Sequence, residues 1–392
     1  MSAFRLHSVS GGGNNPTLYQ QPLCEREFGV RAALLMSAGV PFGGSSSSSN
    51  SMNTSNGNSL NNSGNDINMR RGQVLEVRPY VIAKNFNNFV IDDRRVDAPL
   101  PDPLTISSSR MKQCKPFVIA GFQLGLITPE VEEVLKEYAQ VFVIKDQCVT
   151  LVDTLNTYDS RTKAVAAVLK DMRSQDKFLT LRGWRDEFFE VRINTGKPSI
   201  MRMERAATCI FGIRQFGVDI NGFVNHPEKG LCIWLQKRSD NKQRWPGMWD
   251  NMVSGGLSVG FSVSETAQKE ANEEASIPED MVKDLELVKT ISIFFESERG
   301  LSPNTEFIHD LELPLNFIPR NQDGEVSEFQ LLTAREALDM VLSPKFKTTS
   351  CPVALDFLIR RGVLTDEMEP ELERVKQLLQ IPLLDFYRKL DE

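Results

Sequence analysis

The sequence has few of the residues from which many catalytic and metal centres are built. Its 392 residues include six cysteines and three histidines. The cysteines show no paired spacing, which excludes a disulfide framework or a cysteine zinc site and fits a reducing compartment. His7, His226 and His309 are too scattered for a histidine metal centre or a catalytic triad. If the chain binds a metal, carboxylates must therefore be the ligands.

Long apolar runs and an excess of positive charge are also absent. No apolar run reaches the ~18 residues that a membrane-spanning helix needs, so we expect no membrane partner. The 45 basic and 52 acidic side chains give a formal charge of −7, which argues against a protein that mainly binds nucleic acid. The composition, 41% hydrophobic and 25% charged, is that of a globular protein. We expect a cytoplasmic monomer or homodimer with a small-molecule partner.

The first part of the chain differs in composition from the rest. Residues 43–65 contain nine serines, seven asparagines and four glycines. Such a segment buries too little apolar surface to offset an ordering cost of about 1–2 kcal/mol per residue. Residues 76–105 read as extended and end in three closely spaced prolines, a boundary signal. We therefore predict a disordered, low-complexity tail over residues 1–105, with a mitochondrial targeting signal in residues 1–40 as the alternative.

Two folded units are expected after this tail. Residues 106–205 predict a small accessory α+β domain, with strands over 116–127 and 142–152 and helices over 128–139 and 158–174. Residues 206–392 predict a second unit in which strands, one helix, more strands and then helices follow one another. That order favours an α/β fold with a mixed sheet between helices. Its expected strands are 217–225, 231–239, 250–257, 287–297, 305–314 and 325–332, and its expected helices are 262–276, 333–342, 350–361 and 367–380.

The segment 254–278, SGGLSVGFSVSETAQKEANEEASIP, carries the strongest chemical signal. Gly255 and Gly256 let the backbone approach a ligand closely before a helix begins. Ser262 and Glu265 have the spacing of a capping box, which fixes the start of that helix.

Three glutamates follow on this helix. Glu270, Glu273 and Glu274 are spaced i, i+3 and i+4, so their carboxylates share one face. Carboxylate oxygens are the ligands that Mg²⁺ and Mn²⁺ prefer, with water and phosphate oxygens completing the shell. A solvated acidic helix face is the alternative when the three glutamates are considered alone.

This segment resembles the Nudix box, G-x5-E-x7-R-E-U-x-E-E-x-G-U, in which U is a bulky aliphatic residue. The sequence matches the glutamate core of the box, the opening glycine at Gly255 and a further glycine at Gly260. Lys269 stands in place of the arginine and could pair with Glu265, which would then take over the orienting role of the missing first glutamate. The other departures from the box are Phe261, Ala271 and Ser276.

The resemblance extends over about residues 108–385. It includes WPGMWDN (245–251), DGEVSEF (323–329) and KTTSCPVALDFLIR (347–360). These segments resemble one Nudix branch that has its own N-terminal domain and is often labelled thiamine pyrophosphokinase-related. The resemblance implies the Nudix α/β/α sandwich with a mixed sheet, a divalent cation (Mg²⁺ or Mn²⁺) and hydrolysis of a diphosphate linkage.

The resemblance also implies roles for single residues. The helix glutamates Glu270, Glu273 and Glu274 are the expected metal ligands and catalytic residues, together with the backbone carbonyl at Gly255. Glu325 is the first candidate for the general base, because related proteins return a late glutamate to the metal face. Glu328 and Glu298 are the second and third candidates. A plain turn is the alternative for Glu325, since Asp323-Gly324 is a turn dipeptide.

Substrate contacts are expected around the loop that precedes the box. A basic run could neutralise substrate phosphates, although a solvated loop is the alternative. Its members are Lys237, Arg238, Lys242 and Arg244. Trp245 and Trp249 offer flat faces for a heteroaromatic ring, with core packing as the alternative for at least one. Gly256 would approach the substrate, while Arg185 and Arg205 could link the accessory domain to the pocket.

These features support an enzyme that hydrolyses a diphosphate linkage and releases phosphate. The substrate would be a nucleoside diphosphate-like or thiamine diphosphate-like metabolite, including oxidised forms such as 8-oxo-dGDP. A thiamine pyrophosphokinase is disfavoured, because the sequence has no G-x-x-x-x-G-K-[ST] loop and no protein-kinase signature. A non-catalytic binding module is the remaining alternative. An isomerase that uses Cys232 is disfavoured, and Cys351 is expected to be structural.

Overall fold

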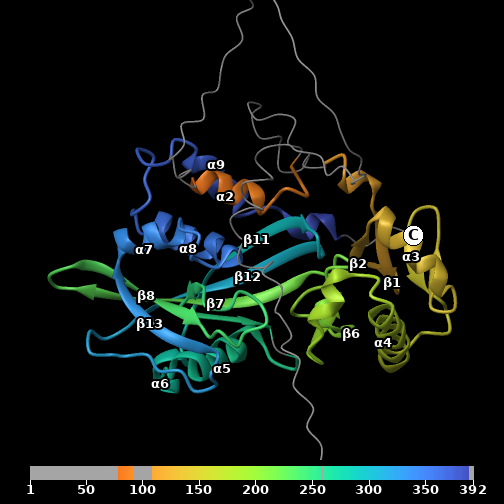
Figure 1. The fold of residues 1–392 in the computed structure, drawn as a ribbon, viewed down its shortest axis with the longest axis horizontal. Helices are drawn as coiled ribbons and strands as arrows, with labels where there is room; N and C mark the ends of the chain where they lie inside the picture. Colours follow the sequence, from red (N-terminus) through yellow and green to blue (C-terminus); the bar gives the residue numbers. More distant parts are fainter. Residues whose placement is uncertain (1–77, 92–107, 258, 388–392) are drawn as a thin grey trace, which may run out of the picture.

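The computed structural model describes residues 78–91, 108–257 and 259–387. Two sheets with their helices make up most of the molecule, a smaller one formed by the first part of the chain and a larger central one (Figure 1). The predicted low-complexity segment and the targeting alternative lie outside the described residues.

The accessory domain is built on a four-stranded sheet in the order β2-β1-β4-β3, in which β1 and β4 are parallel. The expected strand over 142–152 is in fact two strands, because the polar residues Lys145–Gln147 turn the chain and the Lys145 N–H donates to the Cys148 carbonyl at 2.8 Å. The strands are β1 (Lys115–Ile119), β2 (Phe122–Ile127), β3 (Phe142–Ile144) and β4 (Val149–Leu151). Its helices are η2 (Met111–Gln113), α3 (Pro129–Leu135), η3 (Lys136–Tyr138), α4 (Tyr158–Ser174) and η4 (Leu179–Gly183).

A short hairpin and one further turn complete the accessory core. Strands β5 (Phe188–Arg192) and β6 (Ser199–Glu204) form a separate two-stranded sheet, which is followed by η5 (Arg205–Ala207). The ring of Phe211 packs 5.3 Å from that of Phe117 and 5.7 Å from that of Phe142, measured between centroids. The buried core of this unit therefore extends beyond β6, to Ile213.

The central sheet has seven strands in the order β11-β12-β7-β8-β13, with β10 paired to β7 and β9 paired to β8. Strands β12 and β7 are parallel, and the other neighbouring pairs are antiparallel, so the predicted mixed sheet is confirmed. The strands are β7 (Gln215–His226), β8 (Gly230–Arg238), β9 (Trp249–Asn251), β10 (Val253–Gly256), β11 (Leu287–Ser297), β12 (Gly300–Glu312) and β13 (Val326–Thr333).

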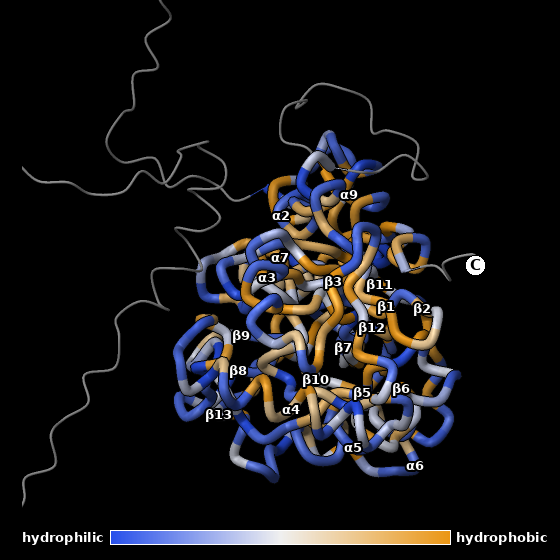
Figure 2. Tube along the Cα trace, turned by 90° about the vertical axis from the view of Figure 1, so that its right-hand side faces the viewer, coloured by the Kyte–Doolittle hydropathy of each residue, from blue (hydrophilic) through white to orange (hydrophobic). Residues whose placement is uncertain are grey.

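Helices cover both faces of this sheet, which confirms the expected sandwich (Figure 1). Side chains alternate between the faces along each strand, so Val218 and Ile220 of β7 face one layer and Phe223 faces the other. Hydrophilic segments dominate the outer loops (Figure 2). The first layer holds α5 (Val263–Ala275) and α6 (Glu279–Val282). The second holds α7 (Ala334–Val341), η6 (Thr348–Ser350), α8 (Cys351–Arg360) and α9 (Leu372–Leu378), and η7 (Leu383–Phe386) follows.

One helix lies where the sequence analysis predicted an extended tail. Residues Pro79–Asn85 form α2, and this prediction is therefore wrong for residues 78–91. Ile82, Ala83 and Phe86 are buried in the same hydrophobic cluster as α8 and α9. The Asn87 amide then donates to the Leu378 carbonyl at 2.7 Å. So short a helix is marginal alone and takes its stability from tertiary packing, which the local sequence does not reveal.

Within the described ranges, no helix combines the length and the apolar character that crossing a membrane requires.

Candidate active site

Helix α5 begins and ends at well-defined residues. The Ser262 hydroxyl accepts from the Glu265 N–H at 3.2 Å, and the Glu265 carboxylate accepts from the Ser262 N–H at 2.8 Å. This confirms the predicted capping box. It also shows that the suggested pairing of Glu265 with Lys269 is wrong, because the carboxylate turns back to the helix start. Ser276 ends the helix in the left-handed conformation at φ 52°, at the position where the Nudix box has glycine.

Small residues let α5 lie close to the sheet. Ala267, Ala271 and Ala275 are buried against Val218 and Ile220 of β7. Ala271 therefore takes the place of the bulky aliphatic residue of the box by allowing a closer approach of helix and sheet.

Gly255 of β10 forms the floor beneath Glu270. A Cβ atom at Gly255 would lie 2.8 Å from the Glu270 Oε2 atom, so no larger residue fits without moving the carboxylate. Burial raises the pKa of Glu270, and the nearby Lys269 ammonium opposes this shift. Strand β10 and helix α5 thus hold the Glu270 carboxylate against the backbone of Gly255, which carries no side chain.

Glu274 is the most deeply buried of the three glutamates, with 2% of its surface exposed. Its Oε2 atom accepts from the Ser254 N–H at 2.8 Å and from the Gln236 amide at 3.3 Å. Burial raises its pKa to about 8, although the Ser254 hydrogen bond acts in the opposite direction. A buried carboxylate of this kind is ionised at neutral pH only if a cation comes close to it.

Glu273 lies on the outer side of the same helix face. Its side chain is 43% exposed and accepts from the Lys269 ammonium at 2.6 Å, and the same ammonium lies 3.2 Å from Glu270 Oε1. Lys269 therefore occupies the space between two of the predicted ligands. As the side chains stand, no three Asp, Glu, His or Cys residues in the described ranges are grouped closely enough to hold a metal ion.

The donor set nevertheless fits a divalent cation. Glu274 is buried and makes no ion pair with any described residue, and Glu270 faces the bare backbone of Gly255. Carboxylate and carbonyl oxygens are the ligands that hard cations prefer. Glu270, Glu273, Glu274 and the carbonyl of Gly255 therefore remain the predicted ligands, with the Lys269 ammonium having to move aside.

Glu325 reaches the same face of α5 from a distant part of the chain. It precedes β13, and its carboxylate forms an ion pair with Lys242. It is also close enough to Glu270 to disfavour ionisation of that carboxyl group. The Asp323 carboxylate accepts from the Glu325 N–H at 2.8 Å, so the predicted turn and the predicted approach to the glutamates occur together.

The two other candidate bases have different surroundings. Glu328 on β13 lies 3.8 Å from Lys237 on β8, across the strand pair. Glu298 is exposed in the turn between β11 and β12.

The predicted basic run is divided among different partners. Arg238 is buried and donates to the Asp250 carboxylate at 3.0 Å, so it holds the strands together and is not free for a phosphate. Lys237 and Lys242 face Glu328 and Glu325. Only Arg244 has no carboxylate within ion-pair distance among the described residues.

The two tryptophans also differ from each other. Trp249 is 8% exposed and lies in the core with Phe223, Leu235 and Phe346, so a stacking role for it is wrong. Neighbouring side chains on a strand point to opposite faces, and the Trp249 ring points to the face that α7, α8 and α9 cover. Trp245 lies half-buried in the loop at φ 55° and remains a candidate for substrate contact.

Two buried acids on the other face of the sheet were missed. The Asp219 carboxylate accepts from the Asn251 amide at 2.9 Å, and Glu306 lies beside Gly217, where a Cβ atom would stand 2.9 Å from its carboxyl carbon. Burial raises the pKa of both groups above their usual range. An acid within the apolar stretch of β7 was a signal for Asp219, but only the parallel β7–β12 pairing brings Glu306 to it.

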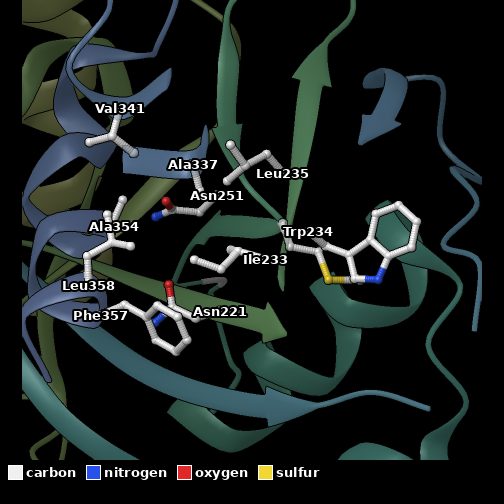
Figure 3. A pocket seen from close by; sticks show the side chains of 11 residues that line it. Asn221, Ile233, Trp234, Leu235, Asn251, Ala337, Val341, Ala354, Phe357 and Leu358 are labelled. Carbon is white, nitrogen blue, oxygen red and sulfur yellow. The ribbon is translucent and has the colours of Figure 1, made fainter. Parts of the chain in front are cut away.

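A small cavity lies between the sheet and helices α7 and α8 (Figure 3). Its lining is mostly apolar, with Ile233, Leu235 and Phe357 from the core and two amides, Asn221 and Asn251. None of the α5 glutamates lines it. We therefore regard this cavity as part of the core and not as the substrate site.

The two parts of the chain each resemble a known family. Residues 216–350 match the family model described as NUDIX domain, and residues 101–215 match a domain of unknown function, DUF4743. Over 281 residues the chain is 33% identical to Nudix hydrolase 20, chloroplastic, of Arabidopsis thaliana, covering 69% of this chain and 74% of the relative. The chain belongs to the Nudix hydrolase family.

A second relative of this Nudix hydrolase aligns over a similar length. The chain is 32% identical over 266 residues to Nudix hydrolase 24, chloroplastic, of Arabidopsis thaliana, covering 67% of this chain and 72% of the relative. Among solved structures, the NUDIX domain of Shewanella oneidensis NrtR, complexed with ADP ribose, aligns with a TM-score of 0.31 at 18% identity. That alignment covers 38% of this chain and 90% of the other.

Family membership settles the general activity. Nudix hydrolases act on pyrophosphate bonds in nucleoside diphosphate derivatives and generally use divalent metal ions, so the predicted hydrolase class is confirmed. The predicted N-terminal domain of its own is the DUF4743 unit. The thiamine pyrophosphokinase-related label stays a prediction, as do the substrate and the location in the cell.

Proposed function

We propose that this Nudix hydrolase cleaves the terminal diphosphate linkage of a nucleoside diphosphate-like or thiamine diphosphate-like metabolite and releases phosphate. The observation that carries the proposal is the packing of Glu270 and Glu274 against the Ser254-Gly255 backbone. This arrangement places two desolvated carboxylates beside bare backbone, at the opening glycine of the Nudix box.

The residues of the site have distinct parts in this reaction. Glu270, Glu273, Glu274 and the carbonyl of Gly255 would hold Mg²⁺ or Mn²⁺, which supplies charge neutralisation at the phosphates and a more acidic water. Without a metal ion, the Lys269 ammonium holds the carboxylates of Glu270 and Glu273 through two ion pairs.

A base must accept a proton from the attacking water. Glu325 is the proposed base, because it approaches Glu270 and is held by the Lys242 ammonium. The ion pair fixes the position of the Glu325 carboxylate, and a carboxylate within hydrogen-bond reach of a water can accept its proton. The oxygen of that water then forms the new bond to phosphorus while the bridging oxygen leaves.

The experiment is a hydrolysis screen of the purified full chain with Mg²⁺ or Mn²⁺. Thiamine diphosphate, its oxidised analogue, ADP, 8-oxo-dGDP and ADP-ribose are incubated separately, and phosphate release is measured. Glu270→Gln and Glu274→Gln should each lower the rate at least about 100-fold, because a metal ligand contributes several kcal/mol to the transition state. Glu373→Gln, at a side chain on α9 that is 75% exposed and has no assigned role, should leave the rate unchanged and serves as the control.

The result also separates the other hypotheses. Phosphate release that persists in both glutamine variants would overturn the assigned site. A rise in melting temperature with Mn²⁺ and a diphosphate, without turnover of any compound, would favour the non-catalytic binding module. Formation of AMP from ATP in the presence of thiamine would favour the kinase.

A further inference from the structure

A pocket lies where the accessory domain meets the hydrolase domain. Strand β5 of the accessory hairpin forms one wall, and the chain around the start of β7 forms another, together with the residue that follows β10. The lining includes Phe189, Glu190, Arg192, Arg214, Phe216 and Leu257. The first four belong to the DUF4743 region and the last two to the NUDIX region, so neither region alone forms the pocket. None of the α5 glutamates lines it.

The pocket is bordered by a buried arginine that has no anionic partner. Arg214 has 5% of its surface exposed and makes no hydrogen bond or ion pair with any described residue. Two aromatic rings flank its guanidinium, because the ring centroids of Phe216 and Tyr387 lie 5.5 Å and 5.3 Å from its Cζ atom. The Tyr387 hydroxyl donates to the Gly212 carbonyl at 2.8 Å. Aromatic rings stabilise a cation, but they leave the N–H groups of the guanidinium without acceptors.

This state is unusual for a buried charge. Buried charged groups are normally paired and hydrogen-bonded, because an unpaired one destabilises the fold. The other buried arginine of the described ranges, Arg238, follows this rule and donates to the Asp250 carboxylate at 3.0 Å. The unpaired nitrogens of Arg214 are not sealed from solvent, and the pocket provides their access to it. A ligand in the pocket could therefore supply the missing acceptors.

A second arginine increases the positive charge of the pocket. Arg192 on β5 is half-buried and makes no ion pair with any described residue. The acid that lines the pocket, Glu190, accepts from the Tyr158 hydroxyl at 3.3 Å and lies beyond ion-pair distance of both arginines. The described lining thus carries two positive charges and one negative charge, which favours an anion.

We propose that this pocket is a second ligand site, which binds the phosphate or carboxylate group of a small organic anion. The N–H groups of Arg214 match the paired oxygens of either group, and Arg192 adds a second positive charge. Phe189 and Leu257 offer apolar surface to the rest of the ligand. The space, about 240 Å³ including its opening to solvent, suits a small ligand. This inference does not depend on the proposed reaction.

The first test measures anion binding without metal. Isothermal titration calorimetry of the full chain in EDTA uses inorganic phosphate, phenyl phosphate and benzoate. We expect the wild type to bind at least one of the two organic anions more tightly than inorganic phosphate. A preference for phenyl phosphate would support a phosphate ester as the ligand, and a preference for benzoate would support a carboxylic acid. Absence of saturable binding for all three anions would overturn the inference.

Substitutions then locate the bound anion. Arg214→Gln should weaken binding at least about tenfold, because a charge-assisted bidentate contact is lost. Arg214→Lys keeps the charge without the planar fork and should have an intermediate affinity. Arg335→Gln removes the same charge from a side chain on α7 that is 68% exposed and should bind like the wild type. Unchanged affinity in Arg214→Gln would show that the anion binds elsewhere and would contradict the proposal.

Folding is measured separately, because Arg214 could serve only to pack the two aromatic rings. A binding role predicts that the melting temperature of Arg214→Gln in anion-free buffer equals that of the wild type or exceeds it, and that the preferred anion raises it less. A lower melting temperature with unchanged anion affinity would show a packing role and refute the site. If Arg214→Gln does not fold, Arg192→Gln decides, since equal affinity in that variant and the wild type would refute the site.

A final variant separates this pocket from the glutamate site. Glu274→Gln should bind the preferred anion in EDTA as the wild type does, because Glu274 does not line the pocket. Anion binding that changes in Glu274→Gln and persists in Arg214→Gln would place the anion at the glutamate site and overturn the inference. Anion binding that depends on Arg214, without hydrolysis of any diphosphate, would support the pocket and refute only the proposed function.

Discussion

At the scale of single residues, the site depends on carboxylates that the protein partly removes from water. Glu274 is buried beside Ser254 with no ion pair among the described residues, and its pKa is raised to about 8. The folded protein without metal therefore holds a proton that the ionised, metal-binding form must release. Proton release and cation binding are consequently linked at this residue.

This linkage predicts how stability depends on pH. Because the pKa of Glu274 is higher in the folded state, its contribution to the unfolding free energy is complete below its ordinary pKa of about 4.3 and is lost as the pH rises through about 8. We expect the wild type in EDTA to lose up to a few kcal/mol over this range, and Glu274→Gln to lose less. Denaturant unfolding at several pH values measures the difference.

Divalent cation provides the control for that measurement. A cation favours the ionised carboxylate, so Mg²⁺ or Mn²⁺ should restore stability to the wild type at alkaline pH and have little effect on Glu274→Gln. Parallel pH curves for the two proteins in EDTA would contradict the assignment of the shift to Glu274.

A second prediction concerns the glycine beneath Glu270. Gly255→Ala would introduce a Cβ atom 2.8 Å from the Glu270 Oε2 atom and force the carboxylate to move. Displacement of a reacting group by about 1 Å can lower a rate about 100-fold, so we expect a loss of that order in phosphate release. Gly196→Ala is the matched control, because its nearest atom would be 3.7 Å away. Equal activity of both variants would show that Glu270 does not depend on this glycine.

At the scale of secondary-structure elements, the capping box of α5 fixes where the glutamates stand. Ser262→Ala removes the acceptor for the Glu265 N–H and should lower the unfolding free energy by about 1 kcal/mol. Thr157→Ala removes the equivalent cap of α4, which accepts from the Ser160 N–H at 3.1 Å, and should lower stability similarly. Activity per folded molecule should fall only in Ser262→Ala, because only α5 carries proposed ligands. A similar fall in the activity of Thr157→Ala would show that activity does not depend on the position of α5.

Elements with strong local patterns could be predicted from the sequence, and those that depend on distant partners could not. Helix α4 matches its predicted range, and α5 and most central strands lie close to theirs, but the expected strand over 250–257 is two strands, β9 and β10, which pair with β8 and β7. Helix α2 was missed, and α9 is shorter than the predicted 367–380, because their stability comes from each other and from the sheet. The local motif predicts Glu270 and Glu274 as site residues, whereas nothing local marks Glu306, which only the parallel pairing of β7 and β12 brings near Asp219.

At the scale of the whole molecule, α2 ties the beginning of the described chain to the hydrolase core. Phe86 is buried with the residues of α8 and α9, and its ring contacts that of Phe295 edge-on, 5.3 Å between centroids. We expect Phe86→Ala to lower the unfolding free energy by about 3–5 kcal/mol. The control Leu315→Ala, at a side chain that is 54% exposed, should change it by less than about 0.5 kcal/mol. A small effect in both variants would show that α2 contributes little to the core.

The hydrogen bond from Asn87 to the Leu378 carbonyl spans 291 positions of the chain. During synthesis, the apolar face of α2 therefore leaves the ribosome long before α8 and α9, against which it packs, have been made. All strands of the accessory sheet have been synthesised before α8 and α9, so that sheet can fold first. The hydrolase core can form only after the end of the chain has been made. Contacts of such high sequence separation form slowly, so the nascent enzyme exposes the apolar side chains of the α2 segment until translation is nearly complete.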